Sequence, residues 1–156
     1  MTIYLCLQIS LILCLCIYLS ICDLKYNLIP VIPIYSAIGL AFLIQIIFSP
    51  FGLCDLLWNF LSGIVNLIIF YFIRIISSKK LGLGDVIFSF FCGFMVKPEF
   101  LWVEQCVAVL LGFVVMIIIS KKNSRHKFPF IPFMSAGLIF AYFLSTSKAL
   151  FQYHGH

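Results

Sequence analysis

Six apolar runs separated by short polar breaks constrain the fold of this chain more than any other feature. Residues 2–22 contain no charged side chain, and five further runs follow, at 31–48, 56–76, 81–96, 101–119 and 130–147. Only 10% of the 156 residues are charged, whereas a soluble domain carries about 25%. A helix needs about 20 mostly apolar residues to cross the hydrocarbon core of a membrane. We therefore predict an all-α, polytopic membrane protein with about six transmembrane helices, and the composition argues against a soluble, disordered or nucleic-acid-binding protein.

The basic residues are distributed unevenly between the two sides that these helices define. Eight of the ten Lys and Arg residues are assigned to the breaks after the first, third and fifth runs, and only Lys97 and Lys148 to the other side. Cytoplasmic loops of membrane proteins carry an excess of Lys and Arg. We therefore expect these three breaks in the cytoplasm and both chain termini outside it, in the cytoplasmic (inner) membrane. The fourth run is only about 24 Å long as a helix, so we expect this helix to begin inside the membrane.

Two carboxylates are predicted on the cytoplasmic side, Asp23 at the end of the first run and Asp85 at the start of the fourth. Ionisable groups in or near membrane spans are costly and usually functional. One crossing outward and one back returns the chain to the same face, so the topology permits the two side chains to meet. Two carboxyl groups that share a site hold one proton between them, as in the aspartic proteases. The pattern therefore indicates that Asp23 and Asp85 are an acid/base pair acting on water.

The residues around both aspartates suit such a site. Gly82 and Gly84 precede Asp85, and glycine permits unusual backbone angles and close approach, so we expect residues 82–84 to form a loop that admits a substrate backbone. Pro30 predicts a turn after the first helix, because proline cannot continue a helix interior.

Lys25 stands two residues after Asp23, where it either holds this carboxylate ionised or serves as one more orientation charge.

The segment that leads into the sixth run carries alternating proline and phenylalanine. Its prolines predict an extended, aromatic wall of a substrate groove on the face of the two aspartates. These residues are Pro129, Phe130, Pro132 and Phe133.

No metal or cofactor site is predicted. The seven cysteines form no Cys-x-x-Cys pair and lie mostly inside the apolar runs, where free cysteine acts as a small apolar residue. Cys54 alone is expected on an outer loop. No triad, P-loop or zinc-protease motif is present in the sequence.

Taken together, the three motifs resemble the peptidase domain of the type IV prepilin and preflagellin leader peptidases, which are Gly-x-Gly-Asp intramembrane aspartic proteases. The resemblance implies that residues 1–156 form one intramembrane aspartic peptidase domain with Asp23 and Asp85 as the catalytic pair. It implies cleavage of a basic leader peptide from a type IV prepilin-like precursor at the cytoplasmic membrane face, with the precursor and membrane lipid as partners. The matching residues are Asp23, Lys25, Ile29 and Pro30, then Gly82, Gly84, Asp85 and Val86, then Pro129, Phe130, Pro132 and Phe133.

The chain departs from the family pattern at three points. Ile87 stands where the family usually has Lys, and Ile131 replaces a small residue between the two Pro-Phe pairs. Longer members carry an N-terminal domain with paired Cys-x-x-Cys motifs linked to methylation; this chain begins at the first run, so we expect no methyltransferase activity. Two alternatives stay open: a small proton-coupled transporter that uses Asp23 or Asp85, and an inactive family member that acts as an assembly factor.

Overall fold

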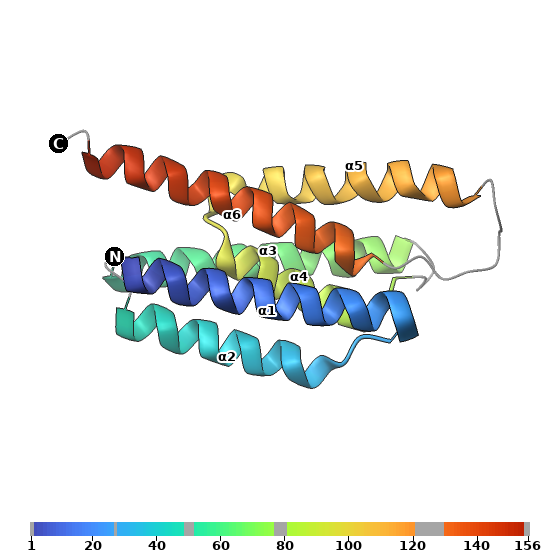
Figure 1. Cartoon of the computed structure of the whole chain (residues 1–156), viewed down its shortest axis with the longest axis horizontal. Coiled ribbons are helices and arrows are strands. Elements are labelled where there is room, and N and C mark those ends of the chain that lie inside the picture. The colour runs from blue at the N-terminus through green and yellow to red at the C-terminus, as the bar shows by residue number, and fades with distance from the viewer. Residues whose placement is uncertain (1, 27, 49–51, 77–80, 121–129, 155–156) are drawn as a thin grey trace.

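The computed structural model is a bundle of six α-helices, in which each helix runs antiparallel to the next along the chain (Figure 1). The structure describes residues 2–26, 28–48, 52–76, 81–120 and 130–154. Within these ranges the chain forms no strand, which confirms the predicted all-α fold class. The elements are α1 (Thr2–Tyr26), α2 (Val31–Phe48), α3 (Gly52–Ile76), α4 (Leu83–Met95), the 3-10 turn η1 (Pro98–Phe100), α5 (Leu101–Ser120) and α6 (Ile131–His154).

Three of the described helices are long and apolar enough to cross a membrane, namely α1 from Ile3, α2 and α3. Large apolar side chains cover their outer surfaces; Ile32 and Ile76, for example, are more than 80% exposed. Exposed apolar surface on this scale is stable against lipid and unstable against water. The chain is therefore a helical membrane protein.

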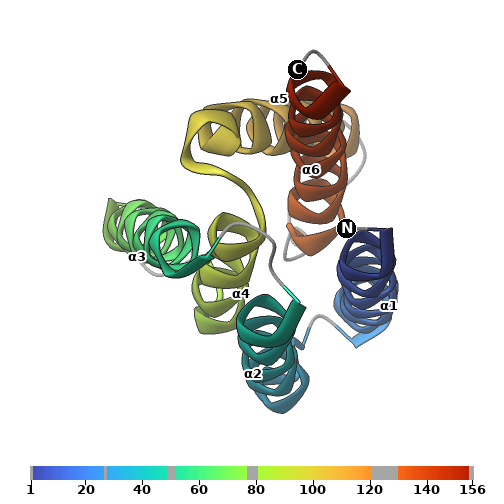
Figure 2. The same ribbon diagram turned by 90° about the vertical axis from the view of Figure 1, so that its left-hand side faces the viewer.

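The fourth helix lies at the centre of the bundle (Figure 2). It packs against α3, α2 and α6, and ten of its 13 residues are buried. Phe88, Phe91 and Phe94 of α4 are almost completely buried between the neighbouring helices. The helix is about 20 Å long, against a hydrocarbon core of about 30 Å. The prediction of a short fourth helix is confirmed.

Small residues hold α4 close to α3. A Cβ atom added to Gly93 would lie 2.7 Å from the carbonyl oxygen of Ser62, and one added to Gly63 would lie 3.0 Å from Phe90. Only glycine permits this separation of the two backbones. The position of every side chain on α4 is therefore fixed relative to α3.

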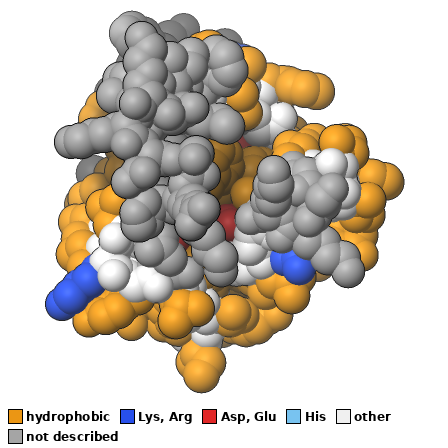
Figure 3. All heavy atoms as spheres, turned by 90° about the vertical axis from the view of Figure 1, so that its right-hand side faces the viewer, with side chains coloured by type: hydrophobic (Ala, Val, Ile, Leu, Met, Phe, Trp, Pro, Cys, Tyr) orange, Lys and Arg blue, Asp and Glu red, His pale blue; other side chains and the backbone are white. Residues whose placement is uncertain are grey.

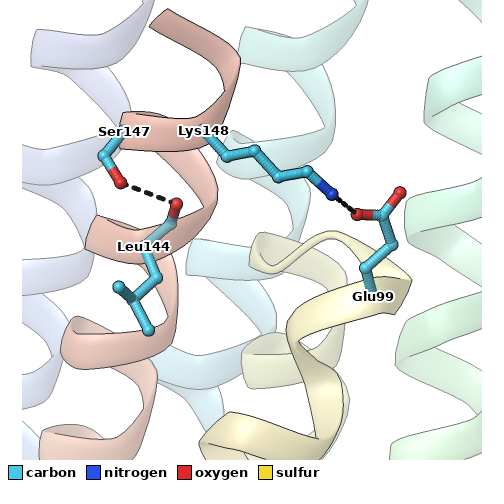
Figure 4. A network of polar contacts seen from close by, with 4 residues as sticks. All are labelled: Glu99, Leu144, Ser147 and Lys148. Carbon is cyan, nitrogen blue, oxygen red and sulfur yellow. Dashed lines mark hydrogen bonds and ion pairs between the residues drawn. The ribbon is translucent and has the colours of Figure 1, made fainter. Parts of the chain in front are cut away.

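One end of the bundle lies on the right in Figure 1, and we call it the site end. Here α1 and α3 end and α4 and α6 begin, as the alternation of the breaks predicts. Away from the site end, Lys148 of α6 forms an ion pair with Glu99 of η1, next to the hydrogen bond from Ser147 to the Leu144 carbonyl (Figure 4). Both charged side chains are more than half exposed, so the pair adds little stability.

The helix bounds differ from the apolar runs at several points. The third helix begins at Gly52 rather than at residue 56, so Cys54 lies in its first turn and the expectation of a loop there was wrong. Arg74 lies in the last turn of the same helix. Helical hydrogen bonding continues through polar residues where a helix leaves the apolar core, and hydropathy alone does not register this extension.

Candidate active site

The last turn of α1 and the first turn of α4 bring Asp23 and Asp85 together at the site end. Each residue is only 6% exposed, and the two side chains are near enough for their charges to interact. They lie 62 positions apart in the sequence. The structure therefore places the two carboxylates close enough to interact, as the topology permitted.

Asp23 is held by the N-terminus of α6. Its Oδ2 atom accepts a hydrogen bond of 3.1 Å from the backbone N–H of Ile131, the first residue of that helix. The first N–H groups of a helix have no partner within the helix, and a carboxylate both satisfies them and complements the helix dipole. This contact fixes α1 against α6 and orients the carboxylate.

Asp85 is held by its own helix start. The N–H of Gly82, the N-cap of α4, donates to Asp85 Oδ2 at 2.9 Å. The second carboxylate oxygen, Oδ1, is buried and has no hydrogen-bond partner among the described residues. One oxygen of this carboxylate thus positions the side chain, while the other remains available to a ligand.

The two glycines before Asp85 differ in their surroundings. The helix begins at Leu83, so the expectation of a loop over residues 82–84 was wrong for Gly84. Neither has a positive φ; among the described residues, Gly52 is the one glycine that does. Instead, a Cβ atom on Gly84 would lie 2.5 Å from Cβ of Ile29, which follows α1. The glycine is required because the two chain segments touch.

The other residues singled out in the sequence lie around the pair in different ways. Pro30 is half-buried in the connection before α2, in agreement with the predicted turn. Lys25 is exposed, with its Nζ atom 5.2 Å from the ring centre of Tyr26. At the start of α6, Phe130 is half-buried with its ring centre 6.0 Å from that of Phe70.

The proline-rich segment forms a helix start rather than an extended wall. Pro132 and Phe133 are half-buried in the first turn of α6, so the expectation of an extended segment was wrong at these positions. Proline is tolerated there because its missing N–H would have no partner within the helix. Pro129 lies outside the described residues. Ile131, a departure from the family pattern, contributes its backbone N–H to Asp23.

The sequence interpretation missed Arg74 as a member of the site. This half-buried residue of α3 is near enough to Asp85 for their charges to interact, and its Nη1 atom is buried without an acceptor among the residues that the structure describes. The sequence did contain an indication of a functional role, because Arg74 is the only charged residue in the apolar run 56–76.

A view onto the site end shows acidic side-chain atoms inside a recess (Figure 3). The interacting charged groups described at this end are two carboxylates and one guanidinium, and no group of three or more metal-ligating side chains occurs among the described residues. Two interacting carboxylates can share one proton, so that one accepts a proton while the other donates one. The arrangement is suited to acid/base chemistry on a water molecule.

Fold and site together define a helical membrane protein with a buried pair of carboxylates at one end of its bundle. The sequence model of the type IV leader peptidase family matches residues 10–121, and the chain belongs to this family of peptidases. The matched range includes Asp23 and Asp85 and ends before the proline-rich segment. No curated protein and no solved structure matches the chain significantly.

Proposed function

We propose that the protein is an intramembrane aspartic endopeptidase that removes the basic leader peptide from type IV prepilin-like precursors. The observation that carries the proposal is the meeting of Asp23 and Asp85, both buried and within electrostatic reach of each other. Membership of a leader peptidase family supports a proteolytic role for this pair.

In the proposed reaction the two carboxyl groups hold one proton. The ionised group takes a proton from a water molecule, whose oxygen attacks the scissile carbonyl carbon, while the neutral group donates its proton to the carbonyl oxygen. The carboxyl that received the proton then passes it to the leaving nitrogen as the C–N bond breaks, and a hydroxyl group of the tetrahedral intermediate returns a proton to the other carboxylate. This scheme requires neither a covalent enzyme intermediate nor a metal ion.

The proposed site of cleavage is the cytoplasmic face of the inner membrane, where we place the site end. Lys25 and Arg74 lie in the last turns of α1 and α3 at this end, which fits the positive-inside rule. A basic leader peptide stays on this side for the same reason. An apolar precursor helix in the membrane would deliver its leader junction to the recess.

Purified protein in detergent, mixed with a prepilin-like precursor, tests the proposal. We expect the wild type to shorten the precursor, and N-terminal sequencing to place the cut after the basic leader. Asp23→Asn and Asp85→Asn each abolish cleavage. The fold persists because an amide oxygen still accepts the hydrogen bonds from Ile131 and Gly82.

Asp55→Asn is the matched control, because Asp55 lies in the first turn of α3, at the opposite end from the pair. It should cleave at the wild-type rate, and EDTA should leave all rates unchanged. Wild-type cleavage by both Asp23→Asn and Asp85→Asn would remove the proposal.

A further inference from the structure

The site contains one donor and one acceptor that the protein leaves unmatched. The N–H of Gly82 donates to Oδ2 of Asp85, whereas Oδ1 has no partner within the described ranges. On the neighbouring helix, Nη1 of Arg74 is buried and has no acceptor in the part of the chain that the structure describes. A buried polar group without a partner is strongly unfavourable and is rare in native proteins. Two such groups on side chains whose charges interact point to a ligand that can match both.

An orientation charge alone does not explain the placement of Arg74. Arginine residues that only mark the cytoplasmic side extend along the helix surface and keep the guanidinium in water. Here one guanidinium nitrogen is removed from solvent, and the side chain lies near Asp85. The contact is not a paired ion bridge, since among the described residues the only ion pair within bonding distance joins Lys148 and Glu99.

A peptide chain undergoing hydrolysis supplies the missing partners. Its carbonyl oxygens accept hydrogen bonds from a guanidinium, and the attacking water donates one to a carboxylate oxygen. We propose that Arg74 is a substrate-binding residue whose Nη1 atom donates a hydrogen bond to a backbone carbonyl oxygen of the precursor next to the bond that is cut. This inference rests on the proposed peptidase function.

The position of Arg74 also fits the departure at Ile87. The family usually has Lys two residues after its second aspartate, but this chain has Ile87 there, half-buried against the apolar core. The positive charge beside Asp85 comes instead from the adjacent helix. A guanidinium on α3 thus supplies a cation to the site from a different direction.

Cleavage kinetics of Arg74→Ala and Arg74→Lys test the inference. Hydrogen bonds that involve a charged group correspond to about a tenfold to hundredfold effect, so we expect Arg74→Ala to lower kcat/KM by about this factor. Millimolar guanidinium ion should restore part of that loss, whereas sodium or ammonium at the same ionic strength should not. Arg74→Lys keeps the orientation charge but not the planar fork of donors, so an intermediate kcat/KM is expected.

Guanidinium rescue distinguishes a role at the site from an orientation role, since membrane topology is set at insertion and is not restored by a small cation. Wild-type kcat/KM in Arg74→Ala, or a loss that guanidinium does not restore, overturns the inference. Asp23→Asn and Asp85→Asn are measured in the same assay. If both are inactive while Arg74→Ala cleaves normally, only this inference fails; if both remain active, the peptidase mechanism itself fails.

Discussion

Replacing Gly84 by alanine adds one methyl group at the closest contact of the candidate site. The new Cβ atom would lie 2.5 Å from Cβ of Ile29 and 2.6 Å from its Cγ2, whereas ordinary contacts begin at 3.4 Å. The start of α4 or the connection after α1 must therefore move by about 1 Å. The closer of the two atoms, Cβ, is fixed to the backbone, so a rotamer change of Ile29 does not relieve the overlap.

The expected effect on stability follows from two opposing terms. Overpacking typically costs about 1–3 kcal/mol, and alanine in a helix gains about 0.5–1 kcal/mol over glycine. We expect a net loss of about 1–2 kcal/mol in the free energy of unfolding. The effect on cleavage is larger, because Gly84 immediately precedes Asp85 and a displacement of about 1 Å at a reacting group lowers the rate about a hundredfold.

Precursor cleavage and detergent-phase unfolding of Gly84→Ala, measured beside Gly39→Ala, check this prediction. Gly39 lies on the exposed side of α2, and a Cβ atom there would meet nothing within 4 Å. The control should be as active as the wild type and equally or slightly more stable. If Gly84→Ala matched Gly39→Ala in both measurements, the close contact with Ile29 would have no part in positioning Asp85.

Two further predictions concern regions outside the candidate site. Asn66 is fully buried and donates to the Ser89 carbonyl at 2.9 Å and to Glu104 Oε2 at 3.2 Å, so Asn66→Ala should lower the free energy of unfolding in micelles by about 2–3 kcal/mol; an unchanged denaturation midpoint would contradict this. Lys148 holds the pKa of Glu99 below its ordinary value of 4.5 through a hydrogen bond and its charge. The resulting stabilisation is present above that value and is lost as the pH falls through the lowered pKa, so the small difference in Tm between wild type and Lys148→Met should exist at neutral pH and vanish once the pH lies below the lowered pKa; a difference that persists in acid would refute the assignment.

The number and order of the helices could be predicted from the sequence because lipid leaves the backbone few choices. Each apolar run must satisfy its own N–H and C=O groups, so a run of sufficient length forms a helix whatever its neighbours do. The shortness of the fourth helix could be predicted in the same way, from the length of its apolar run. The exact ends were missed at both Gly52 and His154, since polar residues at the rim of the membrane continue a helix without adding hydropathy.

Contacts between helices were beyond the sequence. Gly84 was interpreted as a flexible loop residue, and its packing role emerges only when Ile29 lies against it. Glu104 of α5 is fully buried and accepts a hydrogen bond from Asn66 of α3. Neither residue has a neighbour in sequence that reveals which helix it will face.

Arg74 shows why charge counting and site prediction differ. The positive-inside rule sums charges over a loop and its flanks, so it assigned Arg74 an orientation role whichever side of α3 it occupied. Its proximity to Asp85 depends on how α3 is rotated about its axis. That rotation is fixed two to three turns away, where Gly63 and Gly93 bring the backbones of α3 and α4 together. An arginine one position earlier or later would carry the same charge for orientation, yet a turn of about 100° would direct it away from Asp85.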